Sequence, residues 1–137
     1  MITQSCIYCG SARLQSAYQR ARELSLQLDD QPCHANVLVG LATVFEARAD
    51  YRKAQLLLEE YLGQVAGNHP GAFLVESHNL LACSLFHQGA FAQAVEHAEQ
   101  AVALDPPGGC YPFLAASGAH PAMAADDWAA LSLWFLG

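Results

Sequence analysis

The chain has 137 residues, of which 53% are hydrophobic and 14% are charged, and its formal net charge is −7. Such a composition is too apolar for a disordered segment, and the length fits one domain with a continuous core. All six basic residues lie within residues 1–53, whereas residues 54–137 carry eight acidic residues and no Lys or Arg. Because a nucleic-acid surface needs a basic face, the second half cannot supply one, and we expect no nucleic-acid partner.

The cysteines and the apolar runs indicate a cytoplasmic protein that is not embedded in a membrane. The five cysteines are an odd number without the spacing of a disulfide framework, and no signal peptide precedes them. We therefore expect reduced thiols. The longest apolar candidate, residues 128–136, is about half as long as the roughly 20 residues that a membrane span requires.

Residues 1–30 predict a partial repeat. Residues 1–9 are too short for a full first helix, and Gly10 and Ser11 form a turn. From Arg13 onwards the apolar residues recur at helical spacing, at Leu14, Ala17, Tyr18, Ala21, Leu24 and Leu28. We expect a second helix of a pair there, with most of its first helix missing, and a chain break at residues 29–32.

Two helical hairpins are predicted next, over residues 33–68 and 71–106. In each hairpin a stripe of apolar residues at helical spacing is followed by a turn and a second stripe. The second helices begin at Tyr51 and at Phe91, and Asp50 is placed to cap the former. The displacement from Ala42 to Ala82 equals that from Tyr51 to Phe91, which indicates two copies of one unit.

The last part of the chain predicts a connector over residues 107–121 and a partial repeat over residues 122–137. The connector is rich in Pro and Gly. Residues 128–137 align without a gap with residues 80–89, which places Ala130 on Ala82 and Gly137 on Gly89. We expect a further first helix here, whose second helix is missing.

The hairpin over residues 71–106 resembles a tetratricopeptide repeat. The signature positions hold His78, Leu81, Ala82, Leu85, Ala94, Ala98, Ala101 and Pro106, with Gly89 and Phe91 at the turn. His78 stands where Trp is usual, and Ala98 stands where an aromatic residue is usual. The resemblance implies an all-α fold, a right-handed superhelical solenoid of antiparallel helix pairs, as one domain over residues 1–137. It also implies a non-catalytic module that binds a protein or peptide and needs no cofactor.

A narrower resemblance covers residues 14–137. The order of helices, and a connector with Gly118 and Pro121 before the apolar residues 133–137, is similar to the helical repeat region of large bacterial signalling proteins. These are predicted ATPases fused to nucleotide cyclase domains or to DNA-binding regulators. The resemblance implies a regulatory array. A small free-standing adaptor or chaperone of the same fold, which dimerises through its open ends, is the alternative.

In the tetratricopeptide fold the first helix of each pair faces the concave side, where a partner binds. The predicted groove residues are Asn36, Val39, Thr43, Glu46, Asn79, Cys83, Phe86, His87, Asp127, Leu131 and Trp134. Because this set contains no cation, an acidic C-terminal tail would find no compensating charge. An apolar or amphipathic segment fits better, with Phe86 and Trp134 as anchors. Alternatively, a neighbouring repeat or the connector buries these residues.

The open C-terminal end also predicts self-association into a dimer. The residues expected to be partly bare there are Trp128, Leu131, Leu133, Trp134 and Phe135. An apolar patch of this kind usually marks an interface.

A zinc site is a third hypothesis from the sequence. Cys6 and Cys9, together with Cys33 and His34, supply ligand types that zinc prefers. However, adjacent residues such as Cys33 and His34 point apart, and no second pair of close cysteines follows. The six histidines are scattered, so we expect polar surface or capping roles for them and no metal.

Overall fold

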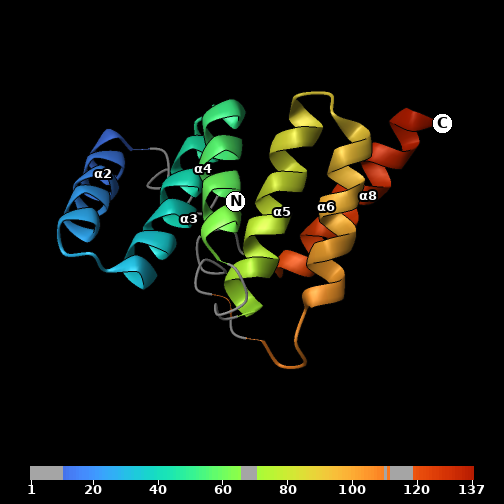
Figure 1. Cartoon of the computed structure of the whole chain (residues 1–137). Coiled ribbons are helices and arrows are strands. Elements are labelled where there is room, and N and C mark those ends of the chain that lie inside the picture. Colours follow the sequence, from blue (N-terminus) through green and yellow to red (C-terminus); the bar gives the residue numbers. More distant parts are fainter. Residues whose placement is uncertain (1–10, 66–70, 110, 112–118) are drawn as a thin grey trace.

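A computed structural model describes residues 11–65, 71–109, 111 and 119–137 of the chain. Within these residues it contains helices and no strand. The helices are α2 (Ala12–Gln27), α3 (Gln31–Ala47), α4 (Tyr51–Gln64), α5 (Gly71–His87), α6 (Phe91–Leu104) and α8 (Pro121–Leu136). They follow one another across the molecule from α2 at one end to α6 and α8 at the other (Figure 1).

The packing of the helices is that of stacked hairpins. Each helix contacts the next one along the chain, from α2 on α3 to α6 on α8. The alternate helices α3, α5 and α8 also contact one another in turn. The expected all-α solenoid of antiparallel helix pairs is therefore confirmed.

The two complete hairpins have matching boundaries. Their first helices begin at Gln31 and Gly71, and their second helices begin at Tyr51 and Phe91, so both starts recur at one and the same displacement along the chain. The chain break expected at residues 29–32 is shorter than predicted, because α3 already begins at Gln31. Asp30 caps this helix by accepting a hydrogen bond from the Cys33 amide at 3.1 Å.

The turn inside each hairpin reverses the chain through one residue with positive φ. In the second hairpin this residue is Gly89, with φ of 78°. The equivalent residue of the first hairpin is Ala49, with φ of 58°. Glycine adopts this conformation freely, whereas it costs an alanine roughly 1 kcal/mol.

Small residues let the helices approach closely, as the sequence predicts. Ala42, Ala54, Ala82 and Ala94 have no exposed surface. One core cluster joins α3, α4, α5 and Ala94 of α6, and a second joins α5, α6 and α8. Gly40 of α3 has the same role toward α2, since a Cβ atom there would overlap the ring of Tyr18.

None of the helices in the described part of the chain combines the length and the apolar character that crossing a membrane needs.

Candidate functional site

The predicted groove residues lie on α3, α5 and α8 but differ in exposure. Five are exposed, namely Asn36, His87, Asp127, Leu131 and Trp134. Four are half-buried, namely Thr43, Glu46, Asn79 and Phe86. Val39 and Cys83 are buried and cannot contact a partner in this conformation, because their side chains face the core between the helices. The accessible part of the predicted groove is therefore concentrated on α8 and at the C-terminal end of α5.

An aromatic cluster of Phe86, Phe91, Trp128 and Phe135 joins α5, α6 and α8. The Phe86 ring centroid lies 5.4 Å from that of Trp128, 5.6 Å from that of Phe91 and 5.9 Å from that of Phe135. Phe91 and Phe135 are stacked at 4.9 Å. Each such pair stabilises the contact by about 0.5–1.5 kcal/mol beyond its buried area. Phe86, an expected anchor for a partner, is thus engaged within the molecule.

Trp134 differs from these rings because it extends away from the core. Its side chain is 75% exposed, although its ring lies 5.1 Å from that of Phe135. Exposed Trp residues are frequent anchors in protein interfaces. Of the two anchors that the sequence suggests, Trp134 is the one that remains free to bind.

A buried polar cluster lies between α3 and α5. The Oε1 atom of Glu46 has no exposed area and no hydrogen-bond partner. Burial raises the pKa of Glu46 to about 7, and the nearby side chains of Cys83 and Ser84 offset part of this rise. Burial is also the main cause that raises the pKa of Cys83, with a further contribution from Glu46.

Cys83 of this cluster also contacts the exposed His87, and Cys, His and Glu are residue types that occur in thiol enzymes, but the geometry does not activate the thiol. The Cys83 Sγ lies 3.6 Å from Nδ1 of His87. The same Nδ1 lies 2.9 Å from the Cys83 carbonyl oxygen. A carbonyl oxygen only accepts, so this nitrogen carries the proton and cannot act as a base toward the thiol. With its pKa raised, Cys83 remains a neutral, weakly nucleophilic thiol.

Two histidines that the sequence places at the surface are buried, and that prediction is wrong for them. His34 Nδ1 lies 3.0 Å from the Ser25 hydroxyl of the preceding helix. His78 Nδ1 lies 2.9 Å from Nδ1 of His97, which requires one ring to donate and the other to accept. Burial, followed by the neighbouring His97, lowers the pKa of His78 to about 4. Both histidines therefore link neighbouring helices, and the lowered pKa keeps His78 neutral at physiological pH.

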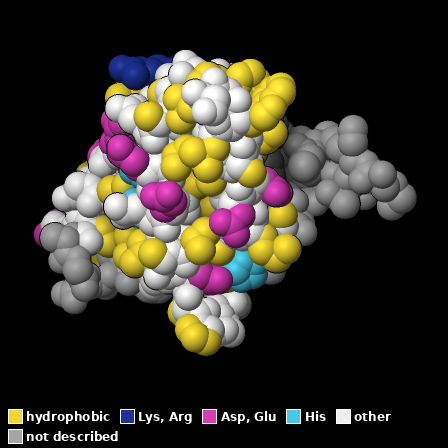
Figure 2. Space-filling view, turned by 90° about the vertical axis from the view of Figure 1, so that its right-hand side faces the viewer, with side chains coloured by type: hydrophobic (Ala, Val, Ile, Leu, Met, Phe, Trp, Pro, Cys, Tyr) yellow, Lys and Arg dark blue, Asp and Glu magenta, His cyan; other side chains and the backbone are white. Residues whose placement is uncertain are grey.

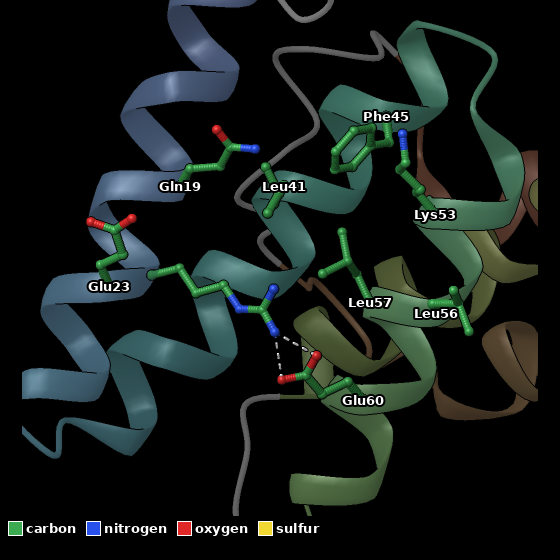
Figure 3. A pocket seen from close by; sticks show the side chains of 9 residues that line it. Gln19, Glu23, Leu41, Phe45, Lys53, Leu56, Leu57 and Glu60 are labelled. Atoms are coloured by element: carbon green, nitrogen blue, oxygen red, sulfur yellow. Dashed lines mark hydrogen bonds and ion pairs between the residues drawn. The ribbon is translucent and has the colours of Figure 1, made fainter.

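A cleft of about 570 Å³ lies between α2, α3 and α4 and was not anticipated from the sequence (Figure 3). Leu41, Phe45 and Leu57 supply apolar lining residues. Across it, Arg22 Nη2 donates to both carboxylate oxygens of Glu60, at 2.7 and 3.0 Å. Nothing in the sequence pairs these residues, which are 38 positions apart. The ion pair holds α2 against the first hairpin.

The zinc hypothesis gains no support from the described residues. Cys6 and Cys9 lie outside them. The Nδ1 atom of His34 is hydrogen-bonded to the Ser25 hydroxyl, and its Nε2 atom lies 3.6 Å from the Glu60 carboxylate. Among residues 11–65, 71–109, 111 and 119–137, no group of three or more His, Cys, Asp or Glu side chains could hold a metal ion.

Of the helices that the structure describes, α8 carries more exposed large apolar side chains than any other, and they gather at its C-terminal end. Leu131, Leu133, Trp134, Phe135 and Leu136 of α8 are all exposed. Figure 2 looks onto this end, where hydrophobic and acidic side chains gather and basic ones appear only at the upper margin. Trp128, which was also expected to be partly bare, is half-buried against Phe86 and His87.

Comparison with known proteins points to the tetratricopeptide repeat. The family model of this repeat matches residues 75–107, which span most of α5 and all of α6. No curated protein and no solved structure matches the chain. The match supports a tetratricopeptide repeat protein, and repeats of this family generally mediate contacts between proteins.

Proposed function

We propose that this chain is a non-catalytic protein-interaction module that binds its partner on the concave side, along α5 and α8. The observation that carries the proposal is the 75% exposed Trp134, which lies beside the aromatic cluster on the helix with the most exposed apolar side chains. A rigid ring held next to packed aromatic neighbours loses little conformational entropy on binding. Trp134 is therefore suited to anchor a partner.

The charges around Trp134 define the chemistry of that partner. The exposed groove residues include Asp127 and no Lys or Arg. An acidic C-terminal tail would meet like charge there, and its carboxylate would remain unpaired. An apolar or amphipathic segment, helical or extended, is the favoured ligand, and basic residues at its edges would face the acidic α8.

The wider setting follows from the resemblance of residues 14–137. We propose a regulatory array of a cytoplasmic bacterial signalling ATPase or transcription regulator. The alternative is a free-standing adaptor or chaperone that self-associates, which the exposed apolar side chains of α8 favour. An NTPase motif in the same reading frame would decide for the first setting.

Selection of peptides from a random display library against the full chain tests the module. Selected peptides would then be titrated by fluorescence anisotropy against the wild type, Trp134→Ala and Leu56→Ala. Leu56 is a matched control because it is an exposed apolar side chain on α4, in the lining of the cleft between α2, α3 and α4 and outside the surface of α5 and α8. We expect Trp134→Ala to weaken binding about tenfold or more, as for an interface anchor, and Leu56→Ala to leave it unchanged. Equal affinities in all three proteins would refute the proposed surface.

A further inference from the structure

Equivalent positions of α5 and α8 show which face of α8 is uncovered. In the gap-free alignment of the two helices, Leu133 corresponds to Leu85, and Ala130 corresponds to Ala82. Leu85 is 4% exposed, whereas Leu133 is 54% exposed. Ala82 has no exposed surface and belongs to the core cluster that contains Ala98 of α6, whereas Ala130 is exposed. This face of α8 is therefore shaped to receive a helix in the position that α6 occupies on α5.

The opposite end of the molecule carries the complementary feature. α2 packs on α3 as α4 packs on α5, so α2 occupies the position of a second helix of a hairpin. Its residues Ala17, Leu24 and Leu28 fall on one helical stripe, and all three are exposed. Leu24 is 40% exposed and Leu28 is 76% exposed. None of the helices described covers this stripe as α3 covers α4.

The two helices also have opposite net charges, although Arg22 of α2 is already paired with Glu60 of α4. α2 carries three arginines and one glutamate, which give it a net charge of +2. α8 carries Asp126 and Asp127 and no basic residue, which give it a net charge of −2. α2 and α8 also have the same length, 16 residues each. Oppositely charged helices attract each other, whereas two copies of α8 would repel each other.

From these observations we propose that copies of this chain associate head to tail, with α2 of one copy packed along α8 of the next. The pair forms a complete repeat across the boundary between copies, in which α8 is the first helix and α2 is the second. This inference rests on the alternative given in the proposed function, a chain that self-associates, and assigns the geometry of that association. A head-to-tail contact leaves one free face at each end, so it generates a ring or an open chain of copies.

Blocking one face at a time tests this geometry. Leu133→Glu places a charge on the α8 face, and Leu24→Glu places one on the α2 face. Leu56→Glu is the control, because Leu56 is a comparably exposed leucine outside both faces. Each protein, and an equimolar mixture of the two blocked variants, would be examined by sedimentation equilibrium over a wide range of concentrations. Circular dichroism checks that each variant is folded. If Leu133→Glu loses helix, Ala130→Glu replaces it, and if Leu24→Glu loses helix, Leu28→Glu replaces it.

The expected results differ between the proteins. Wild type and Leu56→Glu should form species larger than a dimer as concentration rises, or a closed ring. Each blocked variant alone should remain a monomer of 14.7 kDa. The mixture should form a dimer and nothing larger, because each copy contributes the one face that is unchanged.

Two results would overturn the inference. A monomeric wild type at about 100 µM would show that copies do not associate in the range of ordinary dimer affinities. A Leu24→Glu variant that forms a dimer on its own would show a symmetric contact through α8 alone. A peptide-binding measurement on the monomeric Leu133→Glu variant tests the proposed function separately from assembly, because Trp134 is unchanged in this variant. Loss of assembly with retained peptide binding leaves the interaction module in place.

Discussion

Replacing Glu46 by Gln should stabilise the fold at neutral and alkaline pH. The side chain reaches the surface only in part, and its Oε1 atom has no exposed area and no partner. Glutamine keeps the size of the side chain and removes the charge that burial disfavours. The effect should therefore depend on pH in the way that the raised pKa of Glu46 dictates.

The magnitude follows from the pKa. Burial raises it from 4.5 to about 7, so between these values the folded chain binds a proton more readily than the unfolded chain. Wild-type stability is consequently lost as pH rises from about 4.5 to about 7. Each pKa unit corresponds to about 1.4 kcal/mol, so the full loss attributable to Glu46 is about 3 kcal/mol.

Urea denaturation at pH 5 and at pH 8 measures this loss. The free energy of unfolding of Glu46→Gln minus that of the wild type should be larger at pH 8 by about 2–3 kcal/mol. His78 and His97 titrate in both proteins, so their contributions cancel in the difference. Glu99→Gln is the control, because Glu99 is exposed on α6. A difference that is the same at both pH values would show that the carboxyl is not buried as described.

Two further substitutions test the close contacts between helices by chemical denaturation. Ala82→Leu should lower the free energy of unfolding by about 1–3 kcal/mol, because Ala82 packs without exposed surface against α6. Ala92→Leu is the control and should change this free energy little, because Ala92 lies on the exposed face of α6. Gly40→Ala should lower the free energy of unfolding by a smaller amount, about 1 kcal/mol, because the added Cβ overlaps the end of the Tyr18 ring and forces it to move, while alanine gains about 1 kcal/mol of helix propensity. Unchanged stability of either variant would contradict the packing assigned to that contact.

The helices were predictable because their signals are local. The stripe spacing, the cap at Asp50 and the turn at Gly89 act within one hairpin, and the helix starts recur at the displacement that Ala42 and Ala82 predict. The start of α3 was placed too late, because Pro32 is tolerated within the first turn that Asp30 caps. A proline therefore marked the beginning of a helix and not a break.

The contacts between units were not predictable, because they depend on how one hairpin lies on the next. The pairing of Arg22 of α2 with Glu60 of α4 joins two units through residues with no shared sequence pattern. Even within one hairpin, nothing in the sequence pairs His78 of α5 with His97 of α6. Ala130 illustrates the same limit. It occupies the position of Ala82, yet it is exposed because burial there requires a second helix beside it.

The claim that a partner binds at α8 is tested most directly by the affinity of one selected peptide for Trp134→Ala and for Leu56→Ala, measured side by side. The account predicts that the first substitution weakens binding about tenfold or more and that the second leaves it at the wild-type value. Equal affinities, or a larger loss with Leu56→Ala, would contradict it.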